Sequence, residues 1–122
     1  MTAPRRVAYE FGKSGEEAAA RYLEKKKFRI VKRNFRFLKG EIDIIAYDRQ
    51  TLVFIEVKAR KSNEFGPPEE SVTPSKQRQI KRVAKGFLAK NNLHDVECRF
   101  DVISLSFNEK NGYQINHLQD AF

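Results

Sequence analysis

Two stretches of apolar residues with interspersed charges dominate the pattern of this chain. Residues 41–47 and 52–59 are rich in Ile, Val and Phe, and a short polar break separates them. Such β-branched runs predict two neighbouring strands that are buried on at least one face. Asp43, Glu56 and Lys58 lie within these strands and are therefore expected to be half-buried. Because burying a carboxylate costs free energy unless another group compensates it, these charges point to a site.

The pairing of the two strands places the carboxylates together. If Arg49 and Gln50 form a two-residue turn, Asp48 pairs with Thr51, and counting along the hairpin sets Asp43 opposite Glu56. Opposed side chains share one face of a sheet, with Cβ atoms about 4.5–5.5 Å apart. Two like charges there repel each other. A divalent cation bound between them, with Lys58 nearby, would resolve the conflict and create a site for phosphodiester chemistry.

The rest of the chain predicts two helices and three more strands. The first helix is expected from about Tyr9 to Lys27, and the second over about 75–91. Further strands are expected around Phe28–Phe37, at 99–107 and at 112–118. Gly66, Pro67 and Pro68 predict a surface loop over 61–74, and residues 1–8 are expected to be a flexible tail.

The order of these elements predicts the fold class. It is α-β-β-β-α-β-β, which indicates an α/β protein with a mixed central sheet of about five strands flanked by helices. A length of 122 residues fits one domain over 1–122.

A third carboxylate lies on the inward face of the first helix. On a helical wheel, Glu16 is surrounded by small and apolar residues, including Ala19, Ala20 and Leu23, whereas Glu17 faces outward. An isolated Glu on an apolar face is usually paired or extends to solvent. Since this helix is expected to pack on the sheet that carries Asp43 and Glu56, we predict that Glu16 is a third acidic member of the site.

These motifs resemble those of a nuclease superfamily. An acidic strand residue, a hairpin and then Glu56-Val57-Lys58 resemble the PD-(D/E)xK nucleases, although Ile42 replaces the Pro of that name. A longer pattern comprises Gly12-x-x-Gly15-Glu16-x-x-Ala19, Arg33-Asn34, Gly40-Glu41-Ile42-Asp43, Phe54-Ile55-Glu56-Val57-Lys58-x-Arg60, Lys76 and Arg99-Phe100-Asp101-Val102. It resembles the YraN-like family of small bacterial proteins, whose nuclease assignment rests on similarity to archaeal Holliday-junction resolvases.

The resemblance implies a restriction-endonuclease-like core and a metal-dependent DNA endonuclease, acting on branched or structured DNA as the resolvases do. Mg²⁺ or Mn²⁺ would be held by Asp43, Glu56 and the backbone carbonyl of Val57, with Glu16 completing the shell or orienting water. Lys58 would stabilise the developing charge or position the nucleophile. Resolvases act as dimers, so by analogy a homodimer is also expected.

Charge is consistent with a nucleic-acid partner. The chain has 24 Lys and Arg against 16 Asp and Glu, for a net charge of +8 and a pI near 9.7. On the second helix, basic residues cluster opposite the apolar face, and such a stripe is either a solvated face or a phosphate contact. Lys76 instead points toward the buried side at the helix start, where we expect a phosphate contact. The nucleic-acid-binding candidates are Lys76, Gln77, Arg60, Arg78 and Arg82.

Other classes of site are disfavoured by composition. No stretch approaches the roughly 20 apolar residues of a membrane helix, and no signal peptide is evident, so a cytoplasmic protein is expected. Cys98 is the single cysteine, and with His94 and His117 it forms no zinc pattern. Asp101 enters another apolar run, where an Arg such as Arg33, Arg60 or Arg99 would satisfy it as a structural residue.

Two alternatives to the enzyme stay open. The nuclease fold could be a catalytically inactive nucleic-acid-binding module, for which the basic surface would suffice. The protein could instead be a basic α/β interaction protein whose buried charges form internal ion pairs, such as Glu56 with Lys58 or Asp43 with an Arg. The enzyme should be stabilised against unfolding by metal, whereas metal should not affect the interaction protein. Turnover of DNA distinguishes the enzyme from the binding module.

Overall fold

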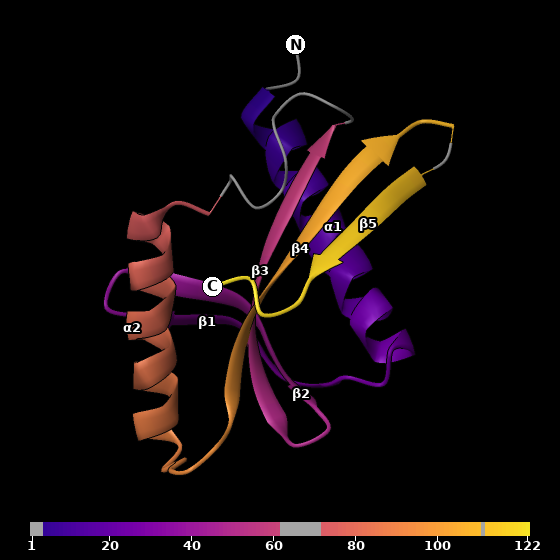
Figure 1. Cartoon of the computed structure of the whole chain (residues 1–122). Helices are drawn as coiled ribbons and strands as arrows, with labels where there is room; N and C mark the ends of the chain where they lie inside the picture. Colours follow the sequence, from indigo (N-terminus) through magenta and orange to yellow (C-terminus); the bar gives the residue numbers. More distant parts are fainter. Residues whose placement is uncertain (1–3, 62–71, 111) are drawn as a thin grey trace.

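The chain forms a five-stranded sheet with one helix on each face (Figure 1). A computed structural model describes residues 4–61, 72–110 and 112–122, with side chains described over 13–60, 72–110 and 112–122. The elements are α1 (Pro4–Lys25), β1 (Arg29–Phe37), β2 (Gly40–Asp48), β3 (Thr51–Lys61), α2 (Pro74–Lys90), β4 (Cys98–Asn108) and β5 (Gly112–Leu118). This order confirms the predicted α/β layout.

The strands lie in chain order across the sheet, β1-β2-β3-β4-β5. Neighbouring strands are antiparallel except β3 and β4, which are parallel. A parallel pair needs a crossover connection, and α2 lies in that connection. The sheet is therefore mixed, as the sequence predicted.

Each face of the sheet buries its own apolar cluster. On one face, Phe54 and Ile45 pack with Ile80, Val83 and Phe87 of α2. On the other face, Ile44 and Ile55 pack with Ala19, Ala20 and Leu23 of α1. The apolar faces that helical periodicity assigned to the two helices are thus the ones that the fold buries.

The hairpin between β2 and β3 has the predicted register. Asp48 pairs with Thr51 around a two-residue turn, in which Arg49 adopts a φ of 58°. Pairing continues from this turn to Ile44 and Ile55, the last pair along the hairpin. Asp43 and Glu56 are the next residues on each strand, so they lie where the pairing of β2 with β3 ends.

Strand β2 changes the face that it presents at Asp43. Ile42 and Ile44 are two residues apart and would share one face of a regular strand, yet Ile42 packs in the α2-side cluster and Ile44 in the α1-side cluster. On the neighbouring strand, Asn34 is in the left-handed region with a φ of 54°. Figure 1 shows the consequence: β1 and β2 extend toward α2, while β3 and β4 run past α1. The sheet therefore opens beside Asp43 and Glu56.

The ends of the elements differ in places from the predicted ones. Helix α1 begins at Pro4 rather than Tyr9, so residues 4–8 of the expected tail are helical and residues 1–3 lie outside the described residues. Proline is compatible with this start because the first helical turn needs no N–H donor there. Most of the expected 61–74 loop, residues 62–71, also lies outside the described residues. Over the part of the chain that the structure describes, neither helix has an apolar stretch long enough to cross a membrane.

Candidate active site

Asp43 and Glu56 form a close carboxyl pair at the opening of the sheet. Glu56 is only 5% exposed, more buried than the sequence predicted, and Asp43 is half-buried. Burial, followed by the negative charge of Glu56, raises the pKa of Asp43 to about 8, and a hydrogen bond between the two carboxyl groups acts in the same direction. The pair therefore holds a proton near neutral pH that two separated carboxylates would release.

The Asp43 side chain also takes the place of a missing backbone contact. Its Oδ2 atom accepts a hydrogen bond from the Val57 N–H at 2.8 Å. This bond lowers the pKa of Asp43, but less than burial and Glu56 raise it. Since regular pairing ends at Ile44 and Ile55, the carboxylate joins β2 to β3 one step further along. Asp43 is thus held in place by the backbone of the Glu56-Val57-Lys58 segment.

Two lysines approach Glu56 from different elements. The Nζ atoms of Lys58, on β3, and Lys76, on α2, each lie 3.7 Å from Glu56 Oε2. Thr73 caps α2 by accepting a hydrogen bond from the Lys76 N–H, which fixes the start of the helix beside the sheet. Lys76 therefore lies beside the carboxyl pair, where its position in the sequence predicted it.

The balance of charge differs between the two carboxyl groups. Glu56 has two ammonium groups within 4 Å, including the Lys58 partner expected for an internal ion pair. Among the described residues, no lysine or arginine forms such an ion pair with Asp43. The expected Asp43–Arg pair is thus absent from that set, and of the two carboxyl groups only Glu56 has cationic partners among the described residues.

Glu16 lies beside this pair without joining it. Burial raises the pKa of Glu16, followed by the charge of Glu41, while Arg33 and a hydrogen bond from Asn34 lower it. The charge of Glu16 contributes only a minor part of the raised pKa of Asp43. Over the described residues, no three Asp, Glu, His or Cys side chains come close enough to bind one metal ion together. The structure thus joins two of the three predicted carboxylates.

Glu41 is a neighbour of the site that the sequence analysis missed. It is half-buried, it repels Glu16, and its Oε2 atom lies 3.5 Å from Arg36 Nε. Strand alternation could have revealed this neighbour, because adjacent residues of a strand point to opposite faces of the sheet. Ile42 packs toward α2, so Glu41 faces the α1 side, where Glu16 lies. The change of face at Asp43 concealed this relation, because a regular strand would put Glu41 and Asp43 together.

The other predicted nucleic-acid contacts occupy different positions around α2 and β3. Gln77 donates from Nε2 to the Val72 carbonyl at 3.1 Å, so it fixes the chain just before α2. Arg78 and Arg82 are exposed, and Arg82 Nη2 donates to the Leu38 carbonyl at 3.4 Å. Arg60 is half-buried on β3, two residues beyond Lys58. Thus Arg78 and Arg82 are accessible to a ligand, and Gln77 also has a structural contact.

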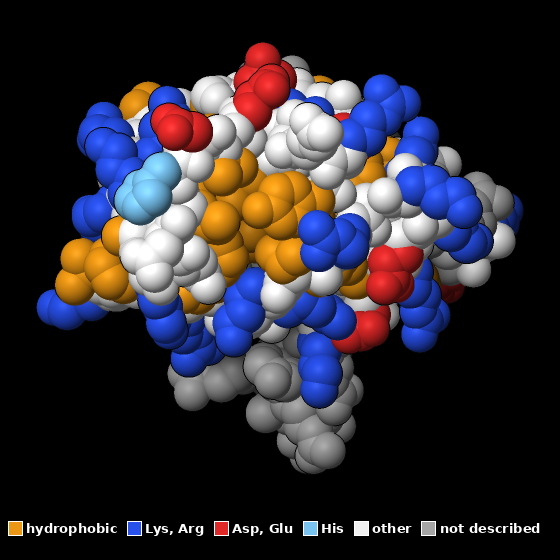
Figure 2. Space-filling model, turned by 90° about the horizontal axis from the view of Figure 1, so that it is seen from below, with side chains coloured by type: hydrophobic (Ala, Val, Ile, Leu, Met, Phe, Trp, Pro, Cys, Tyr) orange, Lys and Arg blue, Asp and Glu red, His pale blue; other side chains and the backbone are white. Residues whose placement is uncertain are grey.

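Basic charge extends well beyond this site. Figure 2 shows the molecule from below, with Lys and Arg side chains on several sides of an apolar patch. The acidic side chains in this view are fewer. A basic surface alone therefore does not identify the site, and the carboxyl pair provides the more specific signal.

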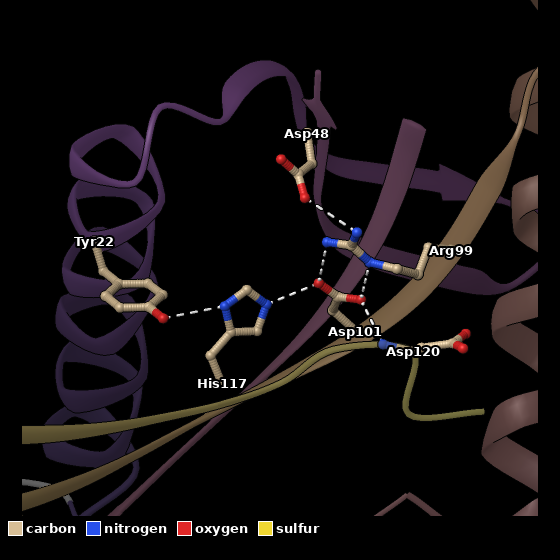
Figure 3. Close-up of polar contacts among 6 residues, drawn as sticks. All are labelled: Tyr22, Asp48, Arg99, Asp101, His117 and Asp120. Atoms are coloured by element: carbon tan, nitrogen blue, oxygen red, sulfur yellow. Dashed lines mark hydrogen bonds and ion pairs between the residues drawn. The ribbon is translucent and has the colours of Figure 1, made fainter. Parts of the chain in front are cut away.

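Asp101 belongs to a separate structural network (Figure 3). It is fully buried and accepts two hydrogen bonds from Arg99, at 2.9 and 3.1 Å, and one from the Asp120 N–H. His117 Nε2 lies 2.7 Å from Asp101 Oδ2, and its Nδ1 atom lies 3.1 Å from the Tyr22 hydroxyl. Although burial opposes it, hydrogen bonds from His117 and Arg99 lower the pKa of Asp101. Asp101 is therefore structural, with Arg99 as the partner among those predicted.

The oxygen atoms at the opening of the sheet suit a hard divalent cation. The Asp43 and Glu56 carboxylates are donors of the kind that Mg²⁺ and Mn²⁺ prefer, and Val57 adds a backbone carbonyl between Glu56 and Lys58. After burial, repulsion by the charge of Glu56 is the next largest cause of the raised pKa of Asp43. A cation at the pair would relieve that repulsion, so these residues fit the metal that the sequence motif implies.

Comparison with known proteins identifies relatives over most of the chain. The model of the uncharacterised protein family UPF0102 matches residues 15–105. A UPF0102 protein of Geotalea uraniireducens is 49% identical over 111 residues, covering 91% of this chain and 87% of the relative. One from Chlorobaculum tepidum is 51% identical over 116 residues, covering 91% and 90%. The names of these relatives state no activity.

Proposed function

This chain belongs to the uncharacterised protein family UPF0102, and we propose that it is a metal-dependent endonuclease that hydrolyses DNA phosphodiester bonds. The observation that carries this proposal is the Asp43–Glu56 pair, in which burial and then the charge of Glu56 raise the pKa of Asp43 to about 8. A protein maintains such a pair at a cost in stability, and perturbed carboxyl groups of this kind concentrate at functional sites. Lys58 beside Glu56 completes the constellation.

Each side chain has a distinct role in the proposed reaction. Asp43, Glu56 and the Val57 carbonyl would hold Mg²⁺ or Mn²⁺, which when bound lowers the pKa of a water ligand and polarises a phosphate. Lys58 would donate to a nonbridging phosphate oxygen and stabilise the charge that develops there. Lys76 would bind a phosphate beside the pair. Glu16, with its pKa also raised, would orient water near the scissile bond.

Basic residues near the pair support a nucleic-acid substrate. Lys76 is already within 4 Å of Glu56, and Arg78 and Arg82 lie exposed along the same helix. Arg60 continues the line of β3 beyond Lys58, and Gln77 lies beside Lys76. Phosphate contacts of this kind provide affinity and position the backbone without reading sequence. Branched DNA is the shape that the resolvase resemblance suggests, and a homodimer acting in the cytoplasm is part of the same proposal.

A cleavage assay tests this function. End-labelled linear, flapped and four-way-junction DNA would be incubated with the protein and Mg²⁺ or Mn²⁺. Asp43→Asn and Glu56→Gln each remove one ionisable carboxyl group while preserving shape. Asp120→Asn is the matched control, because the exposed Asp120 contributes its backbone N–H to the Asp101 network and has a φ of 53° that asparagine tolerates.

The proposal predicts that the wild type and Asp120→Asn cleave DNA only when metal is present. The cleavage rate should be at least about a hundredfold lower in Asp43→Asn and Glu56→Gln. A wild type that binds DNA but leaves it intact under all these conditions would favour the binding module instead. Neither binding nor cleavage would favour the interaction protein, in which the lysines around Glu56 are ion pairs alone.

A further inference from the structure

The turn between β1 and β2 holds an apolar side chain out in solvent. Leu38 is 63% exposed, the highest value among the exposed large apolar residues described. Leu38 and Lys39 are both in the left-handed region, with φ of 46° and 62°. They are the central pair of a two-residue hairpin turn between Phe37 and Gly40, which favours positive φ at both positions, although leucine is an unusual occupant there. The turn therefore presents an exposed apolar side chain at its tip.

The backbone of this turn is fixed to α2, so Leu38 projects from a rigid support. The Phe37 ring packs so closely over Gly86 that a Cβ added there would lie 2.5 Å from it. A Cβ added at Gly40 would lie 2.5 Å from a methyl carbon of Val83. Arg82 donates to the Leu38 carbonyl from the same helix. Anchors on both sides of Leu38 hold its backbone, while its side chain stays exposed.

Cations surround the exposed leucine. A hollow of about 570 Å³ lies at the turn, and it is lined by Arg36, Phe37, Leu38, Lys39, Gly40, Glu41, Lys76 and Gln79. Three of these side chains are positive and one is negative. Lys76, which lines the hollow, also lies 3.7 Å from Glu56. A ligand that enters the hollow meets an apolar tip and a basic rim, and Lys76 is shared between the hollow and the candidate active site.

We propose that this turn is a second DNA contact, in which Leu38 inserts into an opened base step and Arg36, Lys39 and Arg82 bind the adjacent phosphates. The inference rests on the proposed function in taking DNA as the ligand. Apolar wedges such as leucine enter DNA where a base step is unstacked, and nearby cations hold the backbone. The basic rim is complementary to phosphate, which favours this occupant over an apolar protein surface.

A contact through Leu38 should favour DNA with an unstacked base over fully paired DNA, and this preference can be measured without cleavage. In EDTA, binding would be measured on a fully paired duplex and on a duplex with one unpaired base beside 2-aminopurine, whose fluorescence rises when it is unstacked. Leu38→Asn removes the wedge and keeps a residue that tolerates the left-handed conformation. Ile115→Asn is the matched control, because Ile115 is an exposed large apolar residue on β5, outside the hollow.

The wild type and Ile115→Asn should bind the bulged duplex about tenfold more tightly than the paired one and increase the fluorescence. Leu38→Asn should lose both effects while binding the paired duplex as before. The proposal is overturned if Leu38→Asn retains the preference and the signal, or if the wild type shows no preference. A protein that opens the bulged step through Leu38 but cuts no DNA would refute the proposed catalysis and leave this contact established.

Discussion

Replacing Asp43 by asparagine should change how the stability of the protein depends on pH. The pKa of Asp43 is raised to about 8, mainly by burial and then by Glu56, whereas an unfolded aspartate titrates near 3.9. Between these values the folded chain retains a proton that the unfolded chain has lost. The free energy of unfolding therefore falls as pH rises through this window. Asparagine does not titrate, so the variant should lose this dependence.

The expected size follows from the same shift. A single group that stays protonated only in the folded state removes up to about 3 kcal/mol between pH 5 and pH 7. An asparagine side chain at this position can still accept from the Val57 N–H through its carbonyl oxygen and can donate to Glu56. Asp43→Asn should therefore equal the wild type near pH 5 and exceed it by up to about that amount at pH 7 in EDTA.

Urea denaturation at half-unit steps from pH 5 to pH 8, with EDTA present, measures this difference. Asp120→Asn serves as the control and should follow the wild-type curve, because it leaves the carboxyl pair intact. Adding Mn²⁺ at pH 7 should restore stability to the wild type and leave Asp43→Asn unchanged. Parallel stability curves for the wild type and Asp43→Asn across the whole range would refute the argument that folded Asp43 retains its proton in this pH window.

Three further variants test other parts of the structure. Asp101→Asn should lower the free energy of unfolding by roughly 3–5 kcal/mol in chemical denaturation, because it leaves the buried partners of a fully buried carboxylate unsatisfied. The pKa of Asp101 is lowered in the folded protein. The wild type should therefore lose this stabilisation only as pH falls below about 4. Gly86→Ala usually stabilises a helix by about 1 kcal/mol, but here its methyl would meet the Phe37 ring and should destabilise by about 1–3 kcal/mol in thermal melts. Lys76→Ala should weaken DNA binding and lower its salt slope by about one in titrations at several salt concentrations, while a wild-type slope would exclude a phosphate contact.

Much of the fold was predictable because local pattern and burial agree. The register of the β2–β3 hairpin follows from the turn at Arg49 and Gln50, and it brought Asp43 and Glu56 together as predicted. The apolar stripes of the helices correctly gave their buried faces, since helical periodicity directly reflects packing. Lys76 could be placed beside the pair because it begins the helix on its buried side.

The break in the sheet could not be predicted from periodicity. Ile42 and Ile44 read as one face of a regular strand, but they pack on opposite faces because the sheet opens at Asp43. Beside that opening the β1–β2 hairpin packs against α2, and such a long-range contact leaves no local signal in the sequence. The same irregularity separates Glu16 and Glu41 from the carboxyl pair, so the sequence predicted that Asp43 and Glu56 lie together but not that Glu16 lies apart from them.

The account depends most on whether Asp43 and Glu56 form a cation site, and Mn²⁺ binding tests this most directly. Free Mn²⁺ would be counted by electron paramagnetic resonance during titration of the wild type, Asp43→Asn, Glu56→Gln and the Asp120→Asn control at pH 7.5. We predict uptake of Mn²⁺ by the wild type and the control that is abolished in the other two variants. Equal uptake by Asp43→Asn and the wild type would contradict the account, because the metal would then bind elsewhere.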